Sequence, residues 1–198
     1  MAITNGYITL AEFKNELNIT SNTNDSWHED IIEAASRLID NHTGRRFYAT
    51  TETRYYSPDQ SYLLQVDDLL TVTTLKTDDS TRAYATTWET TDYDLHPLNA
   101  GADGRPYTEI GTTVNGDYVF PHYIKGVELA GSFGFCTLVN APPDVKAACM
   151  MLSLRVFKRY DTPLGVTGGS VGTQAIRIPS VINDPDIVAL LTPYRRLV

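Results

Sequence analysis

The stretch from Ser26 to Gly44, SWHEDIIEAASRLIDNHTG, carries the clearest helical pattern in the chain. Its main apolar residues recur at steps of three or four, namely Trp27, Ile31, Ala35 and Leu38. This spacing predicts an amphipathic helix that buries one face. Ser26 and Glu29 have the spacing of a capping box, and Gly44 stands where a left-handed residue would end the helix.

A shorter helix is predicted just before this one. Thr9 and Glu12 have the spacing of a second capping box. Leu10, Phe13 and Leu17 then fall on one helical face. Residues 18–24 are polar and few, which favours a loop. The first 44 residues therefore predict a helical hairpin.

From residue 45 to about residue 138 the composition changes. Thr and Tyr become frequent, and turn residues such as Asp67-Asp68 and Asn115-Gly116 recur at short intervals. This pattern is typical of a β-rich unit. The expected strands are Thr51–Tyr56, Tyr62–Val66, Thr71–Thr77, Thr86–Thr90, Tyr93–His96, Thr108–Gly111, Tyr118–Phe120 and Lys125–Phe133.

Helical patterns return after residue 141. Pro143 and Asp144 suit the first turn of a helix, whose end carries the basic residues Arg155, Lys158 and Arg159. The range Gly165–Gly172 is rich in glycine and predicts a flexible loop. Asp184 followed by a proline predicts the cap of a short helix over Ile187–Leu191.

These patterns together predict an α+β fold. We expect a small helical bundle, made of the N-terminal hairpin and the C-terminal helices, with an inserted and mostly antiparallel β unit. The expected boundaries are residues 1–46 and 139–198 for the helical part and 47–138 for the insertion. The side chains expected in the helical core are Trp27, Ile31, Leu38, Val145, Cys149, Leu152 and Val156.

Composition limits the class of protein. The chain has 198 residues, of which 42% are hydrophobic and 20% charged, as in ordinary globular proteins. No run is long and apolar enough for a membrane span, and the first residues lack the pattern of a signal peptide. Cys136 and Cys149 are too few for a disulfide framework, so a reducing cytoplasm is expected.

Charge is unevenly distributed along the chain. The formal net charge is −8, but residues 141–198 contain seven basic and four acidic side chains. Residues 1–44 contain seven acidic and two basic ones. An acidic protein is a poor candidate for gripping phosphates, so no specific nucleic-acid binding is expected.

No pattern in the chain predicts catalysis, a cofactor or a metal site. The glycine-rich loop has no following lysine and so lacks the phosphate-binding pattern of a P-loop. The histidines lack metal-ligand spacing, and His28 and His42, in the first and last turns of one helix, are expected at the surface or in capping roles. The many tyrosines of the β-rich unit suit either a sheet core or a protein interface, and the core is the more common use.

Three segments carry a resemblance to a known family. They are the start Tyr7–Lys14 with EAASRLIDNHTGRRF at residues 33–47, the helix start at Pro142–Ala148, and LLTPYRR at residues 190–196. They resemble the head–tail connector (adaptor, or head-completion) proteins of long-tailed bacteriophages. The β-rich middle departs from the compact members of that family, which are nearly all helical.

The resemblance implies a structural protein of the virion neck, assembled in the host cytoplasm. It implies a dodecameric ring on the portal protein that extends the DNA channel, lets DNA pass without specific binding, and offers a platform to a stopper or other tail protein. It also implies portal docking by the C-terminal segment. The matching positions are Ile187, Leu190, Leu191, Tyr194, Arg195, Arg196, Leu197 and Val198.

Other functions stay open on the sequence alone. One is a stopper or tail-terminator ring, although its usual β-barrel does not explain the paired N-terminal helices. Another is a receptor-binding or capsid-binding β module built from the tyrosine-rich insertion. A third is a hydrolase that uses two carboxylates of the β-rich unit, although nothing in the sequence singles out a pair.

Overall fold

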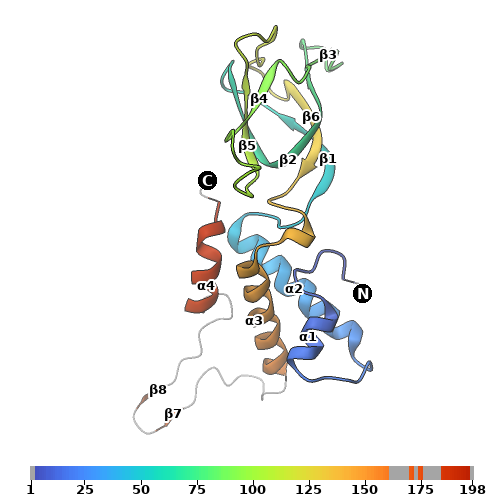
Figure 1. Ribbon diagram of the computed structural model, residues 1–198, viewed down its shortest axis with the longest axis vertical. Coiled ribbons are helices and arrows are strands. Elements are labelled where there is room, and N and C mark those ends of the chain that lie inside the picture. Colours follow the sequence, from blue (N-terminus) through green and yellow to red (C-terminus); the bar gives the residue numbers. More distant parts are fainter. Residues whose placement is uncertain (1–2, 161–169, 172–173, 176–183, 197–198) are drawn as a thin grey trace. The chain divides into compact units, whose positions relative to one another are not determined.

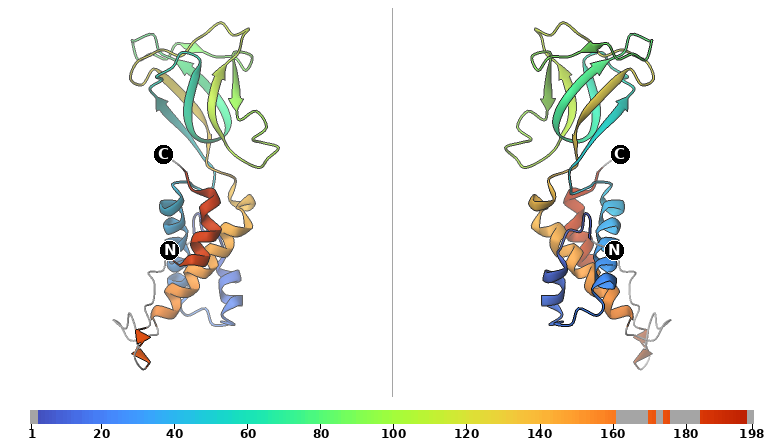
Figure 2. Two further views of the ribbon diagram at one scale, coloured as in Figure 1. Left: turned by 90° about the vertical axis from the view of Figure 1, so that its left-hand side faces the viewer. Right: turned by 90° about the vertical axis from the view of Figure 1, so that its right-hand side faces the viewer.

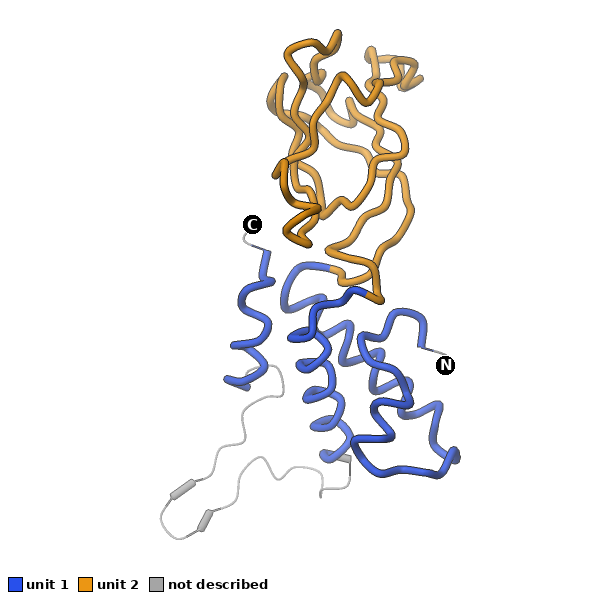
Figure 3. The backbone as a smooth tube through the Cα atoms, in the orientation of Figure 1, with its two compact units in different colours: residues 1–45, 140–198 blue, residues 46–139 orange. Residues whose placement is uncertain are grey.

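The computed structural model describes residues 3–160, 170–171, 174–175 and 184–196 (Figure 1). The chain divides into two compact units. One comprises residues 1–45 and 140–198 and is called here the helical unit; the other, residues 46–139, is the β unit (Figure 3). Helices dominate the described part of the first and an antiparallel sheet dominates the second. The predicted α+β class is therefore confirmed.

The N-terminal hairpin consists of helices α1 (Leu10–Glu16) and α2 (Asp25–Thr43). The capping box of α1 is confirmed, because the Thr9 hydroxyl accepts the N–H of Glu12 at 3.2 Å and the Glu12 carboxylate accepts the N–H of Thr9 at 2.6 Å. The predicted capping box at Ser26 is wrong. Helix α2 starts two residues earlier than this cap predicts, at Asp25, and its N-cap residue Asn24 makes no side-chain hydrogen bond.

Both C-terminal helices start where the proline patterns predict. Helix α3 spans Pro143–Tyr160 and α4 spans Pro185–Leu191. Short 3-10 helices, η1 (Leu138–Asn140) and η3 (Thr192–Tyr194), lie beside them in the sequence. Most of the predicted glycine-rich loop lies outside the described residues. Within that region β7 (Ser170–Val171) pairs with β8 (Gln174–Ala175).

The core of the helical unit lies between α2 and α3. Helix α3 contacts α2, α4 and α1, and Figures 1 and 2 show α1 and α4 on opposite sides of it. The predicted core residues Ile31, Val145, Cys149 and Leu152 are buried, as expected.

Three other residues expected in this core are not buried. Leu38 is 37% exposed, and Trp27 and Val156 are partly exposed. The face of α2 that is buried runs through Ile32, Ala35 and Ile39, so it is rotated from the predicted stripe. Because α1 and α3 together cover only part of α2, one row of its apolar residues stays at the surface.

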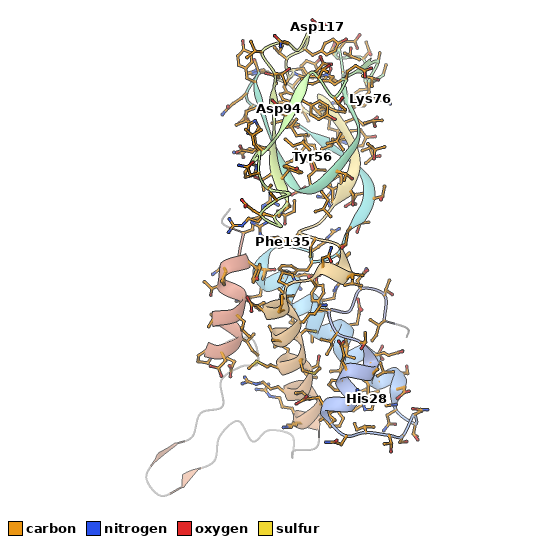
Figure 4. The ribbon with its side chains drawn as sticks, viewed as in Figure 1. His28, Tyr56, Lys76, Asp94, Asp117 and Phe135 are labelled. Atoms are coloured by element: carbon orange, nitrogen blue, oxygen red, sulfur yellow. The ribbon has the colours of Figure 1, made fainter. Side chains whose placement is uncertain are left out.

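His28 is also placed differently from the prediction. Instead of lying at the surface or capping α2, it is 3% exposed (Figure 4). Its ring lies 5.7 Å from Phe13, 5.7 Å from Phe157 and 5.5 Å from Trp27, measured between ring centroids. His28 therefore belongs to an aromatic cluster that joins α1, α2 and α3.

The β unit contains one antiparallel sheet with strand order β1-β6-β2-β5-β4, in which β3 also pairs with β2. Within the described residues the strands are β1 (Thr50–Tyr56), β2 (Leu63–Thr77), β3 (Thr86–Thr87), β4 (Tyr93–His96), β5 (Tyr107–Thr112) and β6 (Val127–Phe133). The predicted antiparallel pairing is confirmed. The predicted strand over Thr86–Thr90 is reduced to its first two residues.

The predicted turn at Asp67-Asp68 is wrong, because β2 is one continuous strand through these residues. Its first part pairs with β5 and its second part with β6, and the register shifts at bulges on either side of Leu69. A bulge bends a strand without ending it, so β2 can pass from one partner to the other.

The predicted strand over Tyr118–Phe120 is also wrong. This segment is part of the connection from β5 to β6, and it is anchored by Phe120, which is buried and stacked on Trp88 with 4.7 Å between ring centroids. Around this pair the core of the β unit contains Leu64, Val66, Leu69, Leu75, Ile110, Val127, Leu129 and Phe133.

Candidate docking segment at the C-terminus

The C-terminal segment begins with a charged cap. One Asp184 carboxylate oxygen accepts the N–H of Asp186 at 3.0 Å, and the other accepts a hydrogen bond from the Arg155 guanidinium on α3. This bond from Arg155 is the main cause that lowers the pKa of Asp184 below its usual value, against a smaller opposing effect of burial. The ion pair therefore fixes the start of α4 on α3.

Ile187 and Leu191, two of the predicted docking residues, point into the protein's own core. Both side chains are 0% exposed. They lie four residues apart on one face of α4, and that face packs on α3. In this arrangement neither side chain is at the surface of the helical unit.

The residues after α4 are also fastened to the helical unit. The Tyr194 hydroxyl donates to a carboxylate oxygen of Asp144 in the first turn of α3 at 3.1 Å. The backbone N–H of Arg196 donates to the carbonyl oxygen of Thr43 at 2.8 Å. Residues 194–196 are thus held against the end of α2 and the start of α3.

Four predicted docking residues have exposed or partly exposed side chains in the described structure. Arg195 is exposed, and Leu190, Tyr194 and Arg196 are partly exposed. Arg196 lies next to Gly44, the left-handed residue that ends α2, with its Cβ 3.6 Å from the place of an added glycine Cβ. Arg45 follows directly, so this surface is basic and carries an aromatic ring. The remaining two, Leu197 and Val198, lie outside the described residues.

A second surface with the composition of an interface lies on the β unit. Tyr62 is 71% exposed and Ile124 is 74% exposed, and Val114 and Val119 are exposed as well. The segments that carry them are tied together, since Phe120 N–H donates to Ser61 at 2.8 Å and Ser61 contacts His122 at 2.7 Å. Several tyrosines do serve the sheet core, as expected, namely Tyr56, Tyr93 and Tyr107.

The described residues offer no further chemistry at these surfaces. Within them, no group of three or more His, Cys, Asp or Glu side chains is placed to hold a metal ion. None of the described helices is both long and apolar enough to cross a bilayer. Cys149 is buried beside Ser36, and burial raises the pKa of its thiol, which leaves it unreactive in the core.

Residues 7–80 match the family described as "Phage gp6-like head-tail connector protein". The resemblance to head–tail connectors is confirmed. This match begins at Tyr7 and includes the whole N-terminal hairpin, so it contains the first of the three segments that carry the resemblance. No curated protein matches the chain.

Solved structures extend the likeness of this connector-like chain to its full length. The chain is similar to a protein in the neck of an empty gene transfer agent particle, determined with C6 symmetry, at 17% identity and a TM-score of 0.62 over 100% of this chain and 94% of the other. A neck of the native particle with C12 symmetry gives 17% identity and a TM-score of 0.62 over 100% and 93%. At this identity the likeness establishes the fold, including the β unit that compact connectors lack.

Sequence reasoning missed two features of this segment. It treated Arg155 as a residue that complements the helix dipole, whereas its side chain reaches Asp184 across a long sequence separation. It also named Ile187 and Leu191 among the docking positions without indicating that their side chains are buried. Their spacing of four, on the face opposite the exposed Pro185 and Ala189, was the available indication that they are core residues.

Proposed function

We propose that this protein is a structural protein of the neck of a phage or phage-like particle, and specifically a head–tail adaptor. It would form a ring on the portal, extend the DNA channel and present a platform to a stopper or tail protein. The observation that carries the proposal is the coincidence of a connector family match over residues 7–80 with a full-length likeness to proteins of a particle neck.

Portal docking is assigned to the surface part of the C-terminal segment. Arginine and tyrosine often dominate interface energies, because they combine area with directed hydrogen bonds. Arg195, Arg196 and Tyr194 provide both residue types on one basic surface. The buried Ile187 and Leu191 would support this surface by holding α4 on α3. Apolar contact with the portal would be added by Leu190, Leu197 and Val198.

The charge of the protein suits a channel for DNA. A net charge of −8 removes the gain in counterion release that makes proteins adhere to duplex DNA. Genomic DNA would therefore slide past the ring without being held.

The exposed apolar side chains of the β unit favour a second role for that unit as an interaction module within the particle. Clustered apolar residues and tyrosine on an anchored loop are typical of protein interfaces. We therefore propose a binding role for the insertion within the adaptor function.

Deletion of the gene for this protein from the genome that encodes the particle tests the proposal. Without it, we expect heads that package DNA but stay tailless or lose their DNA, and complementation in trans should restore tails. Electron microscopy of complemented particles carrying a tagged copy should locate the tag in a ring at the neck. Normal tailed particles from the deletion would contradict the proposal.

A further inference from the structure

The β unit has a distal end, which lies opposite the close approach of its two chain ends. Val127 begins β6 and pairs with Tyr56 of β1, whereas Phe133 ends β6 and directly precedes Gly134. At Gly134 the two chain ends of the unit approach closely. A strand of this length spans about 20 Å at ~3.3 Å per residue, so Tyr56 and Val127 mark the distal end.

Apolar side chains gather on the loops at this distal end. One of them ends the loop that follows β1, and the others lie in the connection from β5 to β6. They are Tyr62, Val114, Val119 and Ile124, all exposed and called here the distal apolar surface. Figure 4 shows Asp117 of the same connection at the end of the β unit that lies opposite Phe135.

Hydrogen bonds bring these loops side by side. The N–H of Thr112 donates to the carbonyl oxygen of Tyr62 at 3.0 Å. The N–H of Phe120 donates to the carbonyl oxygen of Ser61 at 2.8 Å, and the Ser61 hydroxyl contacts His122. The loop that carries Tyr62 therefore lies beside both parts of the connection from β5 to β6, and the exposed side chains belong to one surface.

The loops of the distal end are also held on the core of the β unit. Phe120 is stacked on Trp88, whose indole N–H donates to the Thr77 hydroxyl at 3.0 Å. The Tyr123 hydroxyl donates to the backbone carbonyl oxygen of Asp78. The apolar side chains are thus presented on fixed loops, so a partner that binds them pays little for ordering the backbone.

The exposed charges at the distal end are mostly acidic. On the loops 57–62, 78–92 and 113–126, the exposed acidic residues are Asp59, Asp79, Glu89 and Asp117. Against them stand Arg82 and Lys125, and the ammonium of Lys125 already lies 5.7 Å from the centre of the Tyr55 ring. An acidic rim disfavours phosphate groups as partners, and it disfavours the pairing of this surface with the same surface of a second copy.

We propose that the distal apolar surface docks the next protein of the neck, a protein other than the portal and this chain, through an apolar pocket whose rim is basic. Exposed apolar patches with a polar rim mark protein interfaces, and an aromatic anchor such as Tyr62 often dominates their energy. This inference rests on the proposed adaptor function and assigns its platform to one end of the β unit. The proposed portal-docking surface belongs to the helical unit, so each partner has a unit of its own.

Full-length variants that complement a deletion of the gene in trans test the contact. Tyr62→Ser with Ile124→Ser removes two exposed apolar side chains, and Asp117→Lys reverses a charge of the rim. Mass spectrometry of purified heads should find each variant at the wild-type amount. The fraction of tailed particles in electron micrographs should fall at least about ten-fold with the double variant and at least about three-fold with Asp117→Lys.

Leu98→Ser is the matched control, because Leu98 is an exposed apolar residue of the same unit. It follows β4, which runs away from the distal end, since Tyr93 pairs with Thr112 and His96 with Glu109. This variant should give the wild-type amount of protein in heads and the wild-type fraction of tails. The isolated variants should melt within a few degrees of the wild type, and Val114→Ser, at a fully exposed position, replaces the double variant if that one does not fold.

The outcomes separate this inference from the adaptor function. Wild-type incorporation into heads together with the loss of tails supports the contact. Tails at the wild-type frequency on heads that carry the variants overturn it, and so does an equal loss of tails with Leu98→Ser. Folded variants that fail to enter heads also overturn it, because they would assign the surface to the portal or to a contact between copies. All three results leave the adaptor proposal standing, whereas normal tailed particles from the deletion itself overturn both.

Discussion

The backbone N–H of Phe135 donates a 2.7 Å hydrogen bond to the carbonyl oxygen of Arg46. These two residues lie near the two ends of the β unit, and the rings of Phe47 and Phe135 pack at a tilt beside the bond with 5.2 Å between centroids. The chain segments at these two ends approach closely at Gly134, where an added Cβ would lie 2.1 Å from the carbonyl oxygen of Tyr48. The two ends of the β unit are therefore joined by a close connection of their own.

Excision of the β unit follows from this connection. A hydrogen bond between Arg46 and Phe135 places their Cα atoms about 5 Å apart, so a short Gly/Ser linker can replace residues 47–134. We expect the remaining helical unit to fold, because its core residues all come from the two flanking segments. Circular dichroism should show a helical spectrum with cooperative melting. A random-coil spectrum would contradict the division into two units.

Leu152 and Leu38 provide a matched pair for the helical core. Leu152→Ala should lower the free energy of unfolding by about 2–5 kcal/mol, because its side chain is fully buried. Leu38→Ala should lower it by clearly less, because Leu38 is already 37% exposed. Urea denaturation measures both losses, provided that the dependence of the unfolding free energy on urea concentration has the same slope in the variants as in the wild type. Equal losses would show that the face of α2 is assigned incorrectly.

The ion pair of Arg155 and Asp184 predicts a dependence of stability on pH. Because its pKa is lowered in the folded state, Asp184 contributes stability that is fully present above its unfolded pKa of about 3.9 and is lost as pH falls through the lower folded value. Asp184→Asn keeps a capping side chain but removes the charge. In this variant the unfolding free energy should therefore fall less steeply at acidic pH, which denaturation at a series of pH values measures.

Asp117→Asn is the control for this experiment, since it removes an exposed carboxylate of the β unit. It should leave the acid limb as it is in the wild type. An Asp184→Asn profile that keeps the full acid dependence would show that Arg155 does not stabilise the folded carboxylate.

The C-terminal surface predicts a separation of docking from stability. Arg195→Glu changes an exposed side chain and should shift the melting temperature by no more than a few degrees. It should weaken binding to portal-bearing heads by at least about ten-fold, measured by co-sedimentation. Truncation after Leu191 should abolish that binding, with a small loss of melting temperature because the bonds of Tyr194 and Arg196 go with it.

The surface reversal Arg82→Glu on the β unit serves as the control for Arg195→Glu. It makes the same change of charge at an exposed site outside the docking surface. If both variants bound portal-bearing heads as the wild type does, docking through Arg195 would be excluded.

DNA binding provides a test of the proposed channel. With a net charge of −8, the protein should bind duplex DNA weakly and without sequence preference, with a dissociation constant above about 1 µM at ~0.15 M salt. Fluorescence anisotropy with a labelled duplex measures this constant. Submicromolar affinity at that salt concentration would be inconsistent with a surface past which DNA slides.

The local features of this chain could be predicted from the sequence, because each depends on residues within one or two turns. The capping box of Thr9 and Glu12, the left-handed Gly44 and the Asp184 cap with Pro185 all lie where their patterns indicate. The two segments of the helical unit and the antiparallel β unit follow from periodicity and turn residues. The resemblance of the N-terminal hairpin to connectors was likewise carried by contiguous residues.

What only the tertiary structure decided concerns contacts between residues far apart in the sequence. Periodicity gives an apolar stripe on α2 but not its rotation, so Leu38 was expected inside and His28 outside, and the packing of α3 reversed both. A pair of aspartates predicts a turn, yet β2 continues through Asp67 and Asp68 because it has β5 on one side and β6 on the other. Ile187 and Leu191 are buried because α4 packs on α3, with Arg155 of α3 bonded to Asp184 at the start of α4. In each case the stabilising free energy comes from packing against a segment that is distant in the sequence. The residues around the position itself therefore carry no pattern that predicts the contact.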